Sequence, residues 1–149
     1  MQYYYSKSVE DFVMNIAITS DSTTDLSKEL KERYNIATLP LGVTLGNETY
    51  LDGVNISPDD IYAHHKKTGE LPKTSAANMS DCIDFFQKFV DEGKTVIHFT
   101  LSSEMSSTFN NCRMAGEEFE NVYVVDTKNL STGGGLLVVA AAEMAAKGM

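Results

Sequence analysis

Six hydroxyl side chains crowd one short stretch of the sequence, TLSSEMSSTFNNCRMAG at residues 100–116. Four serines and two threonines fall there between an apolar run and a predicted helix, with no basic residue before Arg113. A helix start carries free backbone N–H groups and the positive end of the helix dipole, which favour an anion. Because one N-cap needs only one hydroxyl, the stretch holds more donors than a cap requires. It therefore indicates either plain caps or a neutral site for a single carboxylate.

Three other polar segments share this richness in short hydroxyl side chains. Ser20–Asp25 and Asp126–Gly135 each follow a predicted strand, and Pro72–Asn78 leads into a helix. In an open α/β sheet, ligands bind outside the carboxyl ends of the strands. We therefore expect these segments and the 100–116 stretch to converge on one cleft.

Familiar catalytic and phosphate-binding motifs do not occur in the sequence. It contains no GxxxxGK[ST] loop, no GxGxxG after the first strand and no GxSxG elbow. The glycines at 133–135 are predicted to form a flexible entry to a tightly packed helix. His64 and His65 are predicted to be solvated, and His98, inside a strand, to be a packed core residue.

Composition narrows the class of protein. The 149 residues are 42% hydrophobic and 22% charged, which suits one domain with a core. A net charge of -9 and a pI near 4.7 argue against nucleic acid and anionic membrane surfaces as partners. No segment approaches the roughly 20 apolar residues of a membrane span, so we expect no membrane insertion. Cys82 and Cys112 are predicted to be buried apolar residues in a reducing, cytoplasmic compartment, not a disulfide or a zinc site.

Predicted strands and helices alternate along the chain, and most predicted strands are continuous apolar runs. That pattern is typical of an α/β domain with a mainly parallel sheet and helices on both faces. A Gly46-Asn47 turn adds a β-hairpin. The predicted strands are Asn15–Thr19, Ile36–Leu39, Thr95–Phe99 and Val122–Val125, with Leu41–Leu45 and Glu48–Leu51 forming the hairpin.

Capping residues predict where the helices begin. Asp25, Ser57 and Asn78 each precede a segment with helical spacing and are the expected N-caps. Between two of these helices, Glu70–Asn78 is predicted to be a loop, and Leu136–Ala146 is predicted to be an apolar, largely buried helix.

The sequence pattern changes at Met14. We expect residues 1–13 to be an N-terminal extension of uncertain origin, since a strand pattern begins directly after Met14. Residues 14–149 are then a single α/β domain, which we expect to be the first part of something longer.

Several of these segments together resemble the DegV family of fatty-acid-binding proteins. The resemblance covers Met14 to the chain end and implies the first domain of a two-domain protein, because family members are usually about twice as long. The segments that carry it are ITSDSTTDL at Ile18–Leu26, Leu39-Pro40-Leu41, Tyr50-Leu51-Asp52-Gly53, PKTS at Pro72–Ser75, Leu101–Phe109 and Val124–Gly135.

The resemblance implies a long-chain fatty acid as the ligand. Thr74 and Ser106 would hydrogen-bond its carboxylate, with its tail in an apolar tunnel. The further candidates implied for the site or its supporting shell are Ser103, Ser107, Ser75 and Ser20. Such a protein has no catalytic residue, metal or cofactor of its own, and it presents the fatty acid to a partner kinase that phosphorylates the carboxyl group.

An enzymatic reading stays open beside the carrier reading. Asp21 and Asp126 follow predicted strands, and with a metal ion they could serve a small-molecule kinase or a phosphatase-like domain. A third reading is a domain whose hydroxyl loops are only helix caps.

Overall fold

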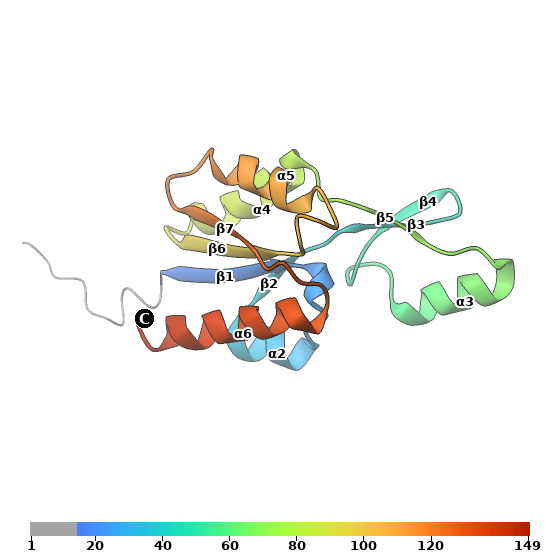
Figure 1. The fold of residues 1–149 in the computed structure, drawn as a ribbon, viewed down its shortest axis with the longest axis horizontal. Helices are drawn as coiled ribbons and strands as arrows, with labels where there is room; N and C mark the ends of the chain where they lie inside the picture. Colours follow the sequence, from blue (N-terminus) through green and yellow to red (C-terminus); the bar gives the residue numbers. More distant parts are fainter. Residues whose placement is uncertain (1–14) are drawn as a thin grey trace, which may run out of the picture.

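A four-stranded parallel sheet forms the body of the protein in the computed structural model, which describes residues 15–149 (Figure 1). The strand order is β2-β1-β6-β7, and every neighbouring pair is parallel. The predicted extension, residues 1–13, lies outside the described residues. The strands are β1 (Ile16–Asp21), β2 (Ala37–Leu39), β6 (Thr95–Thr100) and β7 (Val122–Asp126).

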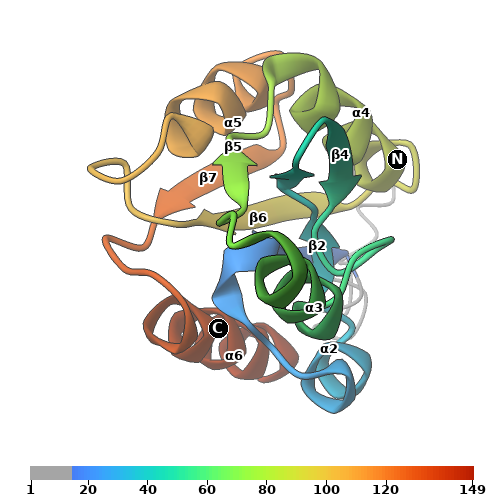
Figure 2. The same cartoon turned by 90° about the vertical axis from the view of Figure 1, so that its right-hand side faces the viewer.

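Helices cover both faces of this sheet (Figures 1 and 2). On one face, Phe86, Val96 and Cys112 belong to a buried cluster; on the other, Ile18 and Val138 belong to a second one. The α/β class with a mainly parallel sheet is therefore confirmed. The first face carries α4 (Met79–Val90) and α5 (Thr108–Gly116), and the second carries α2 (Lys28–Tyr34) and α6 (Thr132–Ala146).

A small antiparallel sheet extends from one end of the body (Figure 1). It confirms the hairpin, β3 (Gly42–Leu45) with β4 (Glu48–Leu51), and adds β5 (Lys73–Ser75) beside β3. The prediction of a loop at Glu70–Asn78 is thus wrong for three residues. All three are exposed, so no apolar alternation marked them, and pairing with β3 alone makes them a strand. The helix α3 (Pro58–Thr68) lies beside this sheet.

Two of the three expected N-caps are confirmed and one is wrong. The Ser57 side chain accepts a hydrogen bond from Asp60 N, and the Asn78 side chain accepts one from Asp81 N. Asp25 instead follows the 3-10 turn η1 (Ser22–Thr24) in the left-handed region, with φ 49°. This turn delays the helix, so Ser27 caps α2.

The glycines at 133–135 lie inside α6, so the prediction of a flexible entry is wrong. A Cβ on Gly135 would lie 2.7 Å from the Thr24 carbonyl oxygen, which shows that close packing requires glycine there. The helix is also less buried than predicted, since Leu136 is 73% exposed and Met144 is 50% exposed. No helix of the described part of the chain is long and apolar enough to cross a bilayer.

The core prediction for His98 is confirmed. The ring is fully buried, its Nδ1 lies 2.9 Å from Thr19 Oγ1, and it meets the Phe86 ring edge-on at 5.1 Å between centroids. Burial lowers the pKa of His98 to about 3, so the ring is neutral near pH 7. His64 differs from its prediction because its side chain is only 24% exposed, with Nε2 3.8 Å from Glu70 Oε2.

Candidate functional site

A hollow of about 510 Å³ opens where the parallel sheet meets the small sheet. Hydroxyl side chains from three separate segments line it: the turn after β1, the strand β5, and the loop that leads into α5. The expected convergence of Ser20–Asp25, Pro72–Asn78 and the 100–116 stretch is therefore observed, and the fourth expected segment, Asp126–Gly135, contributes Leu130. The hydroxyl residues are Thr23, Thr74, Ser75, Ser106 and Ser107.

Apolar side chains complete the lining of this hollow. Leu41 and Val43 come from the β3 side, Leu101 follows β6, and Met105 and Leu130 are exposed residues at its loops. A volume of about 300–1,000 Å³ that combines a few polar groups with apolar walls is typical of small-molecule sites. The hollow thus suits a ligand that has both a polar end and an apolar part.

Pairing with β3 positions the two hydroxyls of β5. Thr74 lies opposite Val43 and Ser75 lies opposite Gly42 in the antiparallel register. A Cβ on Gly42 would lie 2.2 Å from Ser75 Oγ, so the glycine leaves room for this hydroxyl. The sheet, rather than a flexible loop, therefore holds Thr74 and Ser75 at the hollow.

Ser106 combines a capping role with an available donor. Its Oγ accepts a hydrogen bond from Thr108 N at 3.1 Å and lies 2.9 Å from Thr108 Oγ1. When the Thr108 hydroxyl is the donor of that second bond, the Ser106 O–H remains free to donate to a ligand. Ser107 makes no capping bond among the described residues, although it precedes α5.

Asp21 ties the turn after β1 to the loop after β6. One carboxylate oxygen accepts from Leu101 N at 2.7 Å, and the other accepts from Thr23 N at 3.1 Å and from Thr23 Oγ1 at 2.6 Å. Burial raises the pKa of Asp21, while these donors act in the opposite direction. Both oxygens are thus engaged in holding two lining residues in place.

Asp126 connects the end of β7 to two loop residues, Ser103 and Lys128, which lie outside the lining. Its Oδ1 accepts from Ser103 N at 3.2 Å and from Lys128 N at 2.9 Å, and Lys128 Nζ lies 2.9 Å from Oδ2. Desolvation raises the pKa of Asp126, but hydrogen bonds from Ser103 and Lys128 outweigh it and lower the pKa overall. Both aspartates of the enzymatic reading are therefore part of the loop framework.

The six predicted site residues divide into two groups. Thr74, Ser75, Ser106 and Ser107 line the hollow. Ser103 lies outside the lining, and its Oγ accepts from Lys128 Nζ at 2.9 Å. Ser20 also lies outside it, fully buried in β1 with its Oγ 3.1 Å from Thr24 Oγ1.

The other lining residues were not named as site residues from the sequence, among them Thr23, Asp52 and Leu130. Thr23 and Asp52 belong to segments that carry the family resemblance, which was the available signal for them. Leu130 is an apolar residue in a polar loop, and only the tertiary structure brings it to the hollow. Across residues 15–149, no group of three or more histidines, cysteines or acids is arranged to hold a metal ion.

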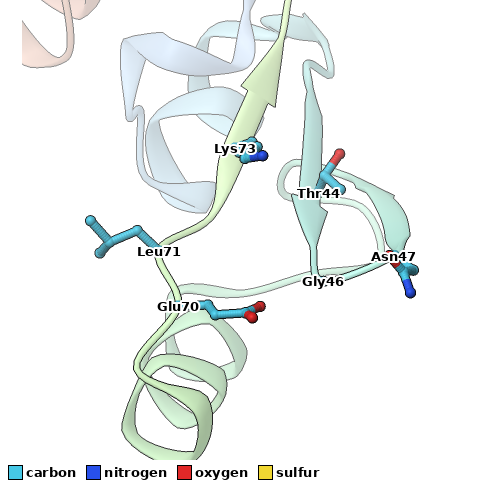
Figure 3. A pocket seen from close by; sticks show the side chains of 6 residues that line it. All are labelled: Thr44, Gly46, Asn47, Glu70, Leu71 and Lys73. Carbon is cyan, nitrogen blue, oxygen red and sulfur yellow. The ribbon is translucent and has the colours of Figure 1, made fainter.

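A second hollow of about 530 Å³ is lined by the hairpin turn and by the segment that leads into β5 (Figure 3). Its lining includes Thr44, Glu70 and Lys73, and Figure 3 shows the Leu71 side chain pointing away from the others. None of the six predicted site residues lines it. Its volume is slightly larger, but the first hollow has four of the predicted hydroxyl residues beside an apolar wall, and we regard it as the candidate site.

Comparison with protein families and curated proteins gives a consistent result. A family model described as "Uncharacterised protein, DegV family" matches residues 15–149. A DegV domain-containing protein of Clostridium perfringens is 35% identical over 136 residues, which cover 90% of this chain and 49% of the relative. One of Listeria innocua is 37% identical over 133 residues, covering 87% and 47%. The chain thus spans about half the length of these relatives.

Solved structures give the same picture. A fatty-acid-binding DegV family protein of Thermus thermophilus superposes with a TM-score of 0.84 at 31% identity, over 91% of this chain and 49% of the other. A stearic-acid-binding protein of Eubacterium ventriosum gives 0.82 at 31% identity, over 91% and 48%. DegV of Bacillus subtilis, described as a fatty acid binding protein, gives 0.83 at 30%, over 90% and 48%.

Proposed function

Because the chain belongs to the DegV family, we propose that it carries the head-group site of a fatty-acid carrier. One observation above all supports this: Thr74 and Ser106, from separate segments, line one hollow whose other walls are largely apolar. The names of the three structural neighbours, which describe fatty-acid or stearic-acid binding, agree with this choice of ligand. The protein would then bind and present its ligand without a reaction of its own.

Thr74 and Ser106 would hold the carboxylate. A buried, unpaired carboxylate is penalised by several kcal/mol, and two or three donors remove that penalty. Ser106 has a free O–H whenever Thr108 donates to it, and Thr74 is an exposed residue of β5 at the hollow. Ser75 and Ser107 stand beside them and would complete the donor set, while Ser103 and Ser20 would support the loops from behind. Hydroxyls stay protonated near neutral pH, so they hold an anion without attacking it.

The acyl chain would supply most of the affinity. Burial of each methylene contributes about 0.8 kcal/mol, so a palmitoyl tail offers on the order of 10 kcal/mol before costs. Leu41, Val43 and Leu101 provide an apolar wall next to the hydroxyls. The tail would continue into an apolar tunnel that the other half of a full-length relative helps to enclose.

The head group would face a partner enzyme. Thr74 and Ser107 are exposed and Ser106 is half-buried, so a carboxylate bound there stays near the surface. We propose that a cytoplasmic fatty acid kinase reaches the carboxylate at this point and phosphorylates it. In a mixture of kinase, ATP and palmitate, acyl phosphate is then expected only when this protein is present in full length.

Binding measurements on paired variants test the head-group assignment. Thr74→Ala and Ser106→Ala should each weaken palmitate binding more than tenfold, since a hydrogen bond to a charged group is worth about 1.5–3 kcal/mol. The matched controls are Thr44→Ala, which removes a hydroxyl from the second hollow, and Ser57→Ala, which removes a serine cap from α3. Both controls should bind palmitate as the unmodified protein does. Equal losses in the Thr74 and Thr44 variants would contradict the assignment.

A further inference from the structure

The two cysteines form a close pair, although 30 positions separate them in the sequence. Cys82 lies on α4 and Cys112 on α5, both are fully buried, and their sulfur atoms are 3.0 Å apart. A disulfide bond is about 2.05 Å long, so the sulfurs would have to approach by about 1 Å to form one. The two helices lie side by side on one face of the sheet (Figure 1).

This pair lies close in sequence to both parts of the candidate site. After Thr74 and Ser75, two alanines and a cap lead directly into α4, where Cys82 is the fourth residue. Ser106 lies two residues before α5, where its Oγ accepts from Thr108 N, and Cys112 is the fifth residue of that helix. The starts of the two helices are joined as well, because Asn111 Nδ2 donates to the Ala77 carbonyl at 2.7 Å.

We infer that Cys82 and Cys112 are a modification site, at which hydrogen peroxide converts the two thiols into an internal disulfide. One cysteine, as its thiolate, attacks the peroxide oxygen, which breaks the O–O bond, gives a sulfenic acid and releases water once a proton is taken up. The second sulfur then attacks the sulfenic sulfur and displaces hydroxide, which leaves as a second water. The sulfurs lose two electrons in total, and the peroxide gains them.

The position of the pair makes this reaction slow but its product durable. Hydrogen bonding to Cys82, together with burial, raises the pKa of Cys112, and the reactive thiolate is therefore scarce in the closed structure. Reaction requires the contact between α4 and α5 to open far enough to admit the oxidant. Once formed, the bond is shielded from thiol reductants by the same packing.

A disulfide here would fix the starts of α4 and α5 relative to each other. Thr74 and Ser106 stand just before those two starts, so the separation of the two carboxylate donors would become less variable. We expect the oxidised protein to release a bound fatty acid more slowly than the reduced protein. This consequence rests on the proposed function, whereas formation of the disulfide does not.

Mass spectrometry after hydrogen peroxide treatment tests the pairing. The full-length protein is treated with peroxide, unfolded and alkylated before digestion. We expect the peptides of Cys82 and Cys112 to be found as one joined species, two hydrogens lighter than the sum of the two peptides. Dithiothreitol should convert this species back into the two separate peptides. Cys82→Ala and Cys112→Ala, checked for folding by circular dichroism, should each lack the joined species. The inference would be overturned if the unmodified protein showed two alkylated thiols, or separate sulfinic acids, at every peroxide dose. This measurement does not depend on any variant.

Palmitate release provides the second readout. Dissociation should be several-fold slower from the oxidised protein, and the Cys112→Ala variant should show no change on peroxide treatment. Equal rates in both redox states would overturn the effect on the site. If neither state binds palmitate while the joined peptides still form, the proposed function fails and the disulfide stands.

Discussion

The body of the protein and the small lobe of β3, β4, β5 and α3 are built in different ways. The body buries two apolar clusters, one on each face of the parallel sheet. In the lobe, α3, which the structure describes completely, has no buried residue, and β5 consists of three exposed residues. The candidate site takes Ser106 from the body and Thr74 from the lobe. The Ser106 side of the site therefore lies on a body with two buried apolar clusters, whereas the Thr74 side lies on a strand that is held mainly by its pairing with β3.

The body should respond most strongly to loss of a core side chain. Phe86 is fully buried and packs against the rings of Phe85, His98 and Phe119. Phe86→Ala should lower the free energy of unfolding by about 3–5 kcal/mol, because it removes apolar contacts and leaves a cavity. Urea unfolding measures this change. As a lobe counterpart, Tyr62→Ala on α3 should change the stability by less than about 0.5 kcal/mol, since Tyr62 is 70% exposed; similar losses would contradict the contrast.

Acid should weaken the body through His98. Its folded pKa of about 3 lies below the ordinary value of 6.5, so its contribution is complete above pH 6.5 and is lost as the pH falls toward 3. The stability that depends on the neutral His98 ring across that window is on the order of 5 kcal/mol. Unfolding experiments between pH 7 and pH 4 should show a steeper loss in the unmodified protein than in His98→Gln, which cannot titrate. Parallel pH profiles would argue against a buried neutral imidazole.

The lobe should respond to a change beside β5 with a loss of ligand rather than of fold. Gly42→Ala places a methyl group 2.2 Å from the present position of Ser75 Oγ, so this hydroxyl must move. We expect palmitate binding to weaken about tenfold, as when one hydrogen bond of about 1.4 kcal/mol is lost, with unfolding little changed. Thr44→Ala, on the same strand β3 but outside the hollow, is the control. Unchanged binding in Gly42→Ala would mean that the geometry of β5 does not matter.

The smallest effect is expected at the start of α3. Ser57 and Asp60 form a capping box there, and Ser57→Ala should lower stability by about 0.5–2 kcal/mol at most. Because α3 lacks buried residues, the loss should appear as faster amide exchange confined to that helix. Faster exchange throughout the parallel sheet would show instead that the lobe and the body unfold together.

The features that the sequence predicted most accurately are those set by short-range pattern, the strands and the helix starts. Apolar runs marked the strands, and Ser57 and Asn78 marked two helix starts, because each signal lies within a few residues. The strand β5 was missed because Lys73–Ser75 has no buried side chain and forms only through its partner β3. The glycines of α6 were misread for a similar reason, since the contact that explains Gly135 comes from Thr24.

For the site, hydroxyl-rich segments and the family resemblance pointed to Thr74, Ser75, Ser106 and Ser107, and all four line the hollow. The segment of Leu130 was expected at the cleft, but this residue was not named, and the pairing of Cys82 with Cys112 was not predicted because it results from packing between distant segments. Ser103 and Ser20 lie outside the lining, because neighbouring polar groups hold their hydroxyls. Local pattern and the family resemblance thus named candidate donors, and only the fold shows which of them line the hollow.

A crystal structure of the full-length protein with palmitate tests the central claim most directly. The account predicts that the carboxylate lies within hydrogen-bonding distance of Thr74 Oγ1 and Ser106 Oγ, with the acyl chain leaving along Leu41 and Leu101. A carboxylate bound elsewhere, for example beside Glu70 and Lys73 in the second hollow, would contradict it.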